Sequence, residues 1–482
     1  MFSYQLPLHA TARHARPRKA SGAPQAAALA AAVAAAVCLW VGSANARCVD
    51  EDAYETGPGG NVAEGAATAD PAQAPLVTTD PRTVLQTLVR DALERSHAVG
   101  AANMLAAAAQ SDIEEAAAGQ RIQASLTAGV GPGGSQSLAG TETSAIQVRA
   151  ALTVSQLLYD GGRVDRLTDW RTQLAESARQ GHLSASEQLA MTTVSLALER
   201  SRYRQHVVVY GQYVRKMACL AEALEAIVRT DRGRASELVQ AQKNLQQAEL
   251  AQSQAMSQAR QVEVRLRRLV GDGLPAAQGL SSLFLQVPPL EQLIPEVELS
   301  SEIAGLTAQA QAASHYAKAV AAGSKPQLSW TLTGSQSVGN GGSVGTTRNG
   351  NYAVGLAVTI PLLNPGVTAA SDAAQKRARA AELQRAEALE SRRFRVAEVH
   401  EQTSASFDRA RRVAGVLRES EQVRNFTLQQ WQQLGRRSLF DVMGAESEHY
   451  NLRISYVNAL HDGQQLNANL QTLGRGVREW LK

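Results

Sequence analysis

The chain repeats itself at one constant offset. The segment ALTVSQLLYDGG at 151–162 returns as GLAVTIPLLNPG at 355–366, and the same offset carries Gly119 onto Gly323. Matches that share one offset without a gap over such a length indicate a tandem duplication, in which each copy must pack with others to close a core. We therefore expect two copies of one supersecondary unit: copy one over 81–273 and copy two over 295–476.

Two segments of each copy alternate between apolar and polar residues, as half-buried strands do. In the second segment of copy one, Ile146, Val148 and Leu152 stand at even positions, whereas Gln147 and Arg149 stand at odd positions. The even positions are the apolar ones in all four segments. Strands of about ten residues with one apolar face suit the wall of a transmembrane barrel, where every backbone group must be paired. A water-soluble sandwich with this face in its core is the alternative.

Long charged segments follow the strands, and each is expected to form one helix of ~100 Å, which suits bridging a periplasm. Apolar or small residues recur in them at spacings of four and three, as in Leu189, Thr193 and Leu196, which is the seam of a coiled coil. The expected elements of copy one are a helix ending at 118, two strands within 121–159, a long helix over 163–230 and a return helix over 234–270. Those of copy two are a helix from 295, two strands within 326–361, a long helix over 366–434 and a return helix over 438–473.

The N-terminus has the features of a secretory signal peptide, which we place at 1–46: basic residues, an apolar run over 26–41 and a small-x-small site at 44–46. Four of the 48 basic residues and none of the 44 acidic residues lie within 1–46, so the remaining chain has 44 basic and 44 acidic side chains. This balance predicts no nucleic-acid partner. The remaining parts are an acidic segment over 47–80 that is expected to be disordered, a linker over 274–294 and a C-terminal tail over 477–482.

Signals for catalysis are few. The G-x-S-x-G pattern at 341–345 lacks the strand before it and the helix after it that a nucleophile elbow needs. His400 and Glu401 are not followed by a second histidine at the spacing of a helical zinc site. The sequence therefore predicts a protein that is not an enzyme, with no catalytic residue, no cofactor and no metal.

The turns that join each long helix to its return helix place arginine near a carboxylate. The first turn carries Arg234 and Glu237, and the second carries Arg436, Arg437 and Asp441. In a symmetric assembly such residues form rings, in which arginine–carboxylate bonds hold helices together and acidic side chains attract cations. We predict a gated entrance at these residues. An exposed, charged helix tip without this function is the alternative.

The order of these features resembles the TolC family of outer-membrane channel-tunnels. The resemblance covers about 84–476 and rests on the duplicated units, on the strand endings LLYDGG (157–162) and PLLNPG (361–366), and on DVMGA at 441–445. It implies a mainly α-helical homotrimer with a small β part, in which each protomer gives four strands to a twelve-stranded barrel in outer-membrane lipid. A coiled-coil α-barrel then continues into the periplasm.

The resemblance also implies roles for residues of the turns. The family's acidic constriction and tip arginine match Asp441 and Arg437, and Glu237 offers charge in the other copy. Its second tip aspartate falls on Gly444, so the acidic ring is reduced. The tips of the family contact a periplasmic adaptor protein, which implies this role for Gly233, Ser236, Gly435 and Ser438, beside the entrance residues Arg234 and Arg436.

Within the family, the chain is most similar to the type I secretion component that exports cyclolysin, the adenylate cyclase toxin. This resemblance implies a passive conduit that serves an inner-membrane ABC exporter through the adaptor and carries a secreted protein of the RTX type. The outer-membrane factor of a multidrug efflux pump is one alternative, because it shares the fold. A periplasmic coiled-coil adaptor or structural protein is another, and it predicts one helical hairpin and no lipid-facing strands.

Overall fold

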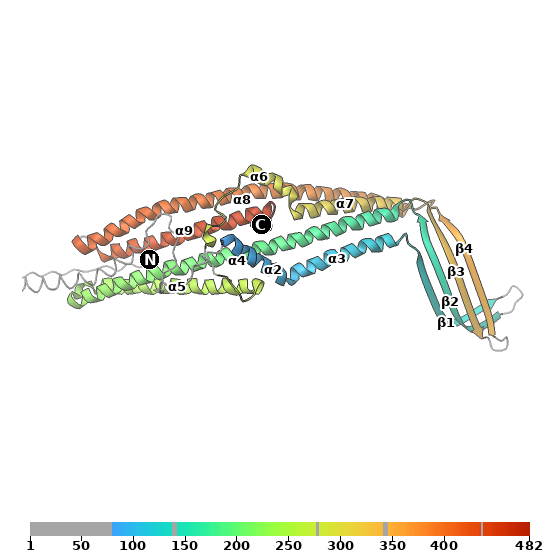
Figure 1. The fold of residues 1–482 in the computed structure, drawn as a ribbon, viewed down its shortest axis with the longest axis horizontal. Helices are drawn as coiled ribbons and strands as arrows, with labels where there is room; N and C mark the ends of the chain where they lie inside the picture. The colour runs from blue at the N-terminus through green and yellow to red at the C-terminus, as the bar shows by residue number, and fades with distance from the viewer. Residues whose placement is uncertain (1–79, 137–141, 276–278, 341–345, 435–436) are drawn as a thin grey trace, which may run out of the picture. The chain divides into compact units, whose positions relative to one another are not determined.

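The computed structural model describes residues 80–136, 142–275, 279–340, 346–434 and 437–482 (Figure 1). They form mostly helix with one four-stranded sheet, which confirms the predicted fold class at the level of a single chain. By their contacts, they divide into two units: residues 215–245, and residues 80–214 with 246–482. The signal peptide predicted at 1–46 and the acidic segment as far as residue 79 lie outside the described residues.

The strands form one antiparallel sheet in the order β1-β2-β3-β4 (Figure 1). They span Gln123–Gln136 (β1), Glu142–Tyr159 (β2), Gln327–Asn340 (β3) and Thr346–Thr359 (β4). Each copy of the repeat therefore supplies one hairpin. Strands β1 and β4 stand at the two edges, where each has a neighbour on one side only within the described chain.

The register carries the predicted alternation across the sheet as far as a shift between β2 and β3 at Leu157 and Tyr159. Leu126 lies opposite Leu152, and Leu332 lies opposite Val354, so even residues pair with even residues and share one face. This face is exposed: Leu126 and Val354 are 74% and 73% accessible. No second sheet covers it in the part of the chain that the structure describes. Within these residues, the sheet is therefore not part of the alternative sandwich.

A buried aspartate turns the chain from β2 into helix α4 (Arg163–Thr230). The Asp160 carboxylate accepts hydrogen bonds from the backbone N–H groups of 162–164 at 2.7 to 3.0 Å, and so satisfies donors that a helix start leaves free. Gly161 has a φ of 69°, and a Cβ there would lie 2.4 Å from the Lys325 side chain. The Asp-Gly-Gly motif is thus the corner between strand and helix.

Three more long helices are α5 (Ala235–Val270), α8 (Pro365–Leu434) and α9 (Leu439–Leu473). Helices α4 and α5 follow one another as one helical hairpin, and α8 and α9 as a second. The seam of α5 is visible in Ala248, Ala255 and Val262, which recur every seven residues and are 3% exposed or less, as coiled-coil packing requires. Helix α8 packs along α9. No helix among the described residues is both long enough and apolar enough to cross a membrane.

The first helix of copy one is interrupted, although a single helix ending at 118 was expected. The structure has α2 (Pro81–Arg95) and α3 (His97–Ala118). Ser96 between them is extended, and its Oγ accepts a hydrogen bond from the N–H of Val99 at 3.2 Å. One serine that caps the second helix is enough to break an alanine-rich run.

The start of copy two also differs from the expectation. Its first long helix is α7 (Ser301–Ala322), which packs along α8 (Figure 1), and not a helix from 295. Before it stand α6 (Leu290–Glu296), which contains Pro295, and the short helix η3 (Val297–Leu299). The extended Ser300 separates them from α7. Part of the linker predicted over 274–294 is therefore helical.

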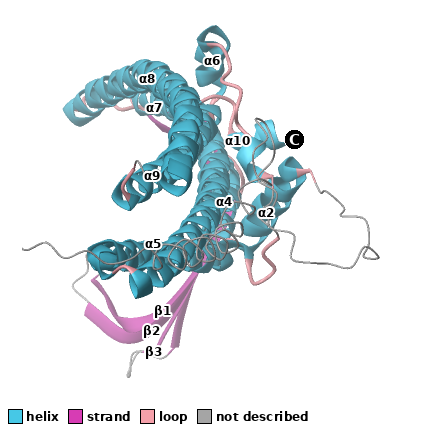
Figure 2. Ribbon diagram, turned by 90° about the vertical axis from the view of Figure 1, so that its left-hand side faces the viewer, coloured by secondary structure: helices cyan, strands magenta, loops and turns pink. Residues whose placement is uncertain are grey.

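The C-terminal residues are a packed helix, and the prediction of a tail over 477–482 is wrong. Helix α10 (Val477–Leu481) packs against α2 and α9, and Figure 2 shows it near α2. The Trp480 ring stacks on Phe284 at 4.1 Å between centroids, and the Arg82 guanidinium lies 4.8 Å from the Trp480 ring centre. Val477, Trp480 and Leu481 are spaced to share one helix face, which allows even this short helix to join the core.

Candidate functional site

The second tip turn is fixed by its own helix cap. Ser438 precedes α9, and its Oγ accepts a hydrogen bond from the N–H of Phe440 at 3.1 Å. Asp441 Oδ2 accepts in return from the N–H of Ser438 at 3.3 Å, which completes a capping box. The predicted gate residue Asp441 is therefore held at a defined place at the start of α9.

The predicted partner of Asp441 lies beside it. Arg437 Nη1 is 3.8 Å from Asp441 Oδ2, and Arg437 Nε donates to Gln430 Oε1 at 3.2 Å. Both members of the ion pair have about half of the side chain exposed, where such pairs contribute about 0–1 kcal/mol. Gly435 and Arg436, the other predicted residues of this turn, lie outside the described residues.

The first tip turn belongs to the other unit and is arranged in its own way. The short helix η1 (Arg232–Arg234) is capped by Asp231, whose Oδ1 accepts from the N–H of Gly233 at 3.0 Å. Arg234 Nε lies 3.6 Å from Glu237 Oε2, and the Glu237 side chain is only 15% exposed. The structure thus brings the predicted pair together, while Ser236 stays on the surface.

A buried ion pair links α8 to α9 behind the second turn. Arg424 Nη1 lies 3.7 Å from Glu446 Oε2, with side chains 7% and 0% exposed. Sequence reasoning missed this pair, although its signal was present. Glu446 falls on the buried stripe of α9 that Leu439 and Val442 begin, at spacings of three and four residues.

Copy one contacts copy two through α4 and α9. Arg202 Nε donates to Asn458 Oδ1 at 2.8 Å, and Arg202 Nη1 donates to Asp462 Oδ1 at 3.1 Å. His206 Nε2 donates to the same Asn458 oxygen at 2.9 Å. His461 is 2% exposed, and its Nδ1 donates to its own helix at the carbonyl of residue 457, at 2.9 Å. These residues form the α4–α9 contact.

Burial sets the protonation of both histidines in this contact. Desolvation, followed by the positive charge of Arg202, lowers the pKa of His206 to about 4. Desolvation also lowers the pKa of His461 to about 4, again with Arg202 acting in the same direction. Both rings are therefore neutral at neutral pH, and protonation would place positive charge beside an arginine.

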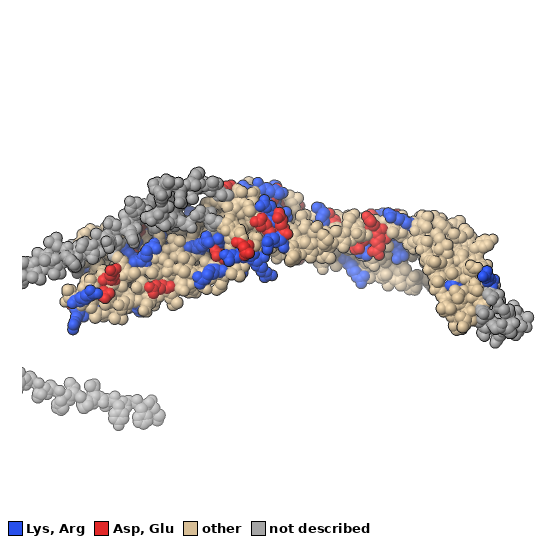
Figure 3. Space-filling view, turned by 60° about the horizontal axis from the view of Figure 1, so that its bottom comes forward, with Lys and Arg blue, Asp and Glu red and all other residues tan. Residues whose placement is uncertain are grey.

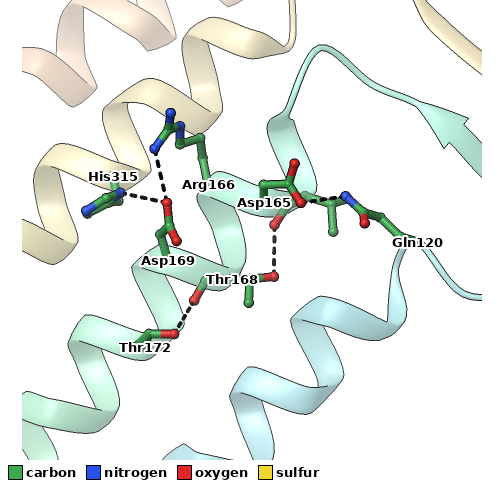
Figure 4. A network of polar contacts seen from close by, with 8 residues as sticks. Gln120, Asp165, Arg166, Thr168, Asp169, Thr172 and His315 are labelled. Atoms are coloured by element: carbon green, nitrogen blue, oxygen red, sulfur yellow. Dashed lines mark hydrogen bonds and ion pairs between the residues drawn. The ribbon is translucent and has the colours of Figure 1, made fainter.

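A polar network lies where the helices meet the sheet (Figure 4). Asp169 of α4 binds Arg166 Nη1 at 3.1 Å and His315 Nδ1 of α7 at 3.2 Å. Gln120 Nε2, just before β1, donates to Asp165 Oδ1 at 2.8 Å. Residues of α4 thus contact both repeats near the strands.

One open groove of about 590 Å³ lies between α4, the start of α7 and the end of α9. One of its charged lining groups is Arg392, whose Nε and Nη2 donate to the carbonyls of Leu473 and Thr472 at 3.1 and 3.3 Å and which pairs with Glu302. Desolvation lowers the pKa of Arg392. The guanidinium N–H groups of Arg392 donate to carbonyls at the end of α9, so Arg392 holds that end against α8.

Among the described residues, no group of three or more histidine, cysteine, aspartate or glutamate side chains is placed to hold a metal ion. The tip pairs and the buried pair consist of arginine and carboxylate. Such groups can hold helices together or present charge to a solute.

Comparison with solved structures gives consistent likenesses. CusC, from a study of its folding and transmembrane channel formation, has 18% identity and a TM-score of 0.71 over 82% of this chain and 92% of that one. The outer membrane protein VceC from Vibrio cholerae has 18% identity and a TM-score of 0.69 over 82% and 96%. The open state of the Neisseria gonorrhoeae MtrE outer membrane channel has 20% identity and a TM-score of 0.64 over 82% and 90%.

The comparisons by sequence give a different result. No family model matches the chain, and no curated protein matches it. Identities of 18% to 20% to the solved structures show the fold alone. The chain has the TolC-like channel-tunnel fold of these outer-membrane channels, as the resemblance of its sequence implied.

Proposed function

We propose that the chain is one protomer of a trimeric outer-membrane channel that works with a periplasmic adaptor and an inner-membrane transporter. The observation that carries this proposal is the sheet, which exposes an apolar face and leaves an edge at β1 and another at β4. An apolar face of this kind suits lipid, and in lipid a sheet must close so that no edge is left unpaired. Further copies of the chain would supply the missing neighbours.

The conduit proposed here is passive. The tip and contact residues are arginine–carboxylate pairs and neutral histidines, and their geometry serves to hold helices together. Energy for transport would come from the inner-membrane partner. The two helical hairpins and the sheet weigh against the alternative of a periplasmic adaptor or structural protein, which predicts one hairpin and no such strands.

The tip pair gives a first test of gating. We expect Arg437→Ser and Asp441→Ala each to raise the resting conductance in planar bilayers by about twofold to fivefold, because an exposed ion pair holds the closed form by up to ~1 kcal/mol. Arg412→Ser, which removes an exposed arginine farther along α8, is the control and should leave the conductance unchanged. Unchanged conductance in both tip variants would remove these residues from the gate.

For the cargo, we propose a secreted protein of the RTX type that an ABC exporter delivers, and at the tips we propose adaptor contacts at Gly233, Ser236, Gly435 and Ser438. The test compares proteins in the culture supernatant of wild-type and gene-deleted cells by mass spectrometry. Loss of one large, acidic protein with glycine-rich repeats would support type I export. An unchanged secretome with new sensitivity to dyes and detergents would support multidrug efflux instead.

A further inference from the structure

The two faces of the sheet differ sharply in character. Even residues make the apolar face, and odd residues make a face of small, mostly neutral polar side chains. The register places the odd residues in rows across the strands. Two neighbouring rows are Ser125, Thr153 and Thr333, and then Thr127, Ala151 and Ser335.

Two charged side chains occur in the described strand residues 123–133, 146–159, 327–340 and 348–359, and the register puts them on opposite faces. Arg149 lies in the odd row, opposite Gly129 on one side and Ser337 on the other. Arg348 pairs with Val338 in an even row. The visible surface of the sheet is accordingly almost free of charge, in contrast to the helices (Figure 3).

The Arg149 guanidinium is positioned by neutral groups. Its Nε and Nη2 donate to Gln147 Oε1 at 3.1 and 2.8 Å, and Gln147 Nε2 donates in turn to the carbonyl of Gly133 at 3.4 Å. A Cβ at Gly133 would lie 2.5 Å from Arg149 Nη2, so the glycine leaves room for the guanidinium. No carboxylate of the described residues forms an ion pair with Arg149. The side chain therefore presents a positive charge that no carboxylate of these residues balances.

We propose that Arg149 gives the membrane end of the conduit a preference for anions. The inference rests on the proposed function, because it requires the polar face to line the lumen of a closed wall. Each protomer would then add one guanidinium at the same level, between rows of small neutral residues. Rings of arginine or lysine in a pore favour anions, and a wall of low dielectric strengthens the field of such a ring. The class of solute that the ring attracts is small anions and acidic groups on a cargo.

The test measures the reversal potential of single channels in a KCl gradient, in the Asp441→Ala background so that the carboxylate at the tip does not mask the effect. Arg149→Gln should raise the ratio of potassium to chloride permeability at least about twofold, and Arg149→Glu should raise it further. Arg149→Lys keeps the charge and should keep the original ratio. Arg348→Gln, on the other face, is the matched control and should also leave it unchanged.

The outcomes distinguish the role of Arg149 from the proposed channel function. Channels that conduct, but with the same permeability ratio in Arg149→Gln and its parent, would overturn the role of Arg149 and leave the channel intact. An equal shift in Arg348→Gln would also overturn it, because the effect would then not depend on the face. Absence of any conductance from the parent chain would overturn the proposed function and this inference with it. Heat-resistant trimers on gels show that each variant has assembled.

Discussion

Glu446→Ala is expected to destabilise the helical part of the protein by about 3–5 kcal/mol, because it removes one charge of the buried Arg424–Glu446 ion pair. The two side chains are 7% and 0% exposed, so the pair lies away from water. Surface ion pairs such as Arg437–Asp441 should have far smaller effects. The measurement is thermal unfolding of the detergent-solubilised protein, followed by far-ultraviolet circular dichroism.

The control for this prediction lies on the same helix. Glu448 is exposed, so Glu448→Ala should change the free energy of unfolding by no more than about 0.5 kcal/mol. If Glu446→Ala and Glu448→Ala melt at the same temperature as the wild type, the buried pair does not stabilise the fold. Glu446→Gln, which keeps the shape and a hydrogen-bond acceptor, should fall between the two.

The second large effect is expected on acidification. His206 and His461 have folded pKa values lowered to about 4 from 6.5. A group whose folded pKa is depressed contributes stability above its unfolded pKa and loses that contribution as pH falls through the folded value. The loss should therefore run from about pH 6.5 down to about pH 4. At 1.36 kcal/mol for each pKa unit, it amounts to about 3 kcal/mol per histidine.

The groups that face these histidines also predict that protonation lowers stability. On α4, Arg202 adds a positive charge; on α9, Asn458 accepts hydrogen bonds and Asp462 pairs with Arg202. We expect the α4–α9 contact to loosen as the rings become charged. Melting temperatures measured between pH 7.5 and 4.5 should fall steeply for the wild type and less steeply for the double variant His206→Gln, His461→Gln. Parallel curves for the two proteins would exclude the histidines as the cause.

The features that the sequence predicted correctly have a local signal, which is either a repeating pattern along the chain or a residue that suits one turn or helix end. Alternation along β2 and β4 is a direct consequence of strand geometry, so the apolar face could be assigned without knowing the partner strands. Asp160 and the glycines after it mark the corner between β2 and α4, because few other residues tolerate that turn. Pro81 likewise marked the start of α2, because the fixed φ of proline suits the first position of a helix and its missing N–H has no helical partner there.

The features that sequence missed depend on contacts between distant parts of the chain or on a single cap. Ser96 and Ser300 interrupt otherwise continuous helical patterns, and nothing in the neighbouring alanines signals the break. The packing of α10 requires a site on α2 and the linker, which lie far away in sequence. Glu446 and His461 are buried on α9, and Arg424, which pairs with Glu446, lies on α8, so the sequence alone did not single them out.

In the proposed assembly, several copies of this chain close the sheet into a wall in lipid and enclose a water-filled conduit. The most direct measurement is the conductance of the purified protein in planar lipid bilayers. We expect discrete conductance steps from a heat-resistant trimer, with a larger unit step for Asp441→Ala than for the wild type. A protein that stays monomeric without detergent and gives no conductance steps, with or without the tip substitution, would contradict the proposed assembly.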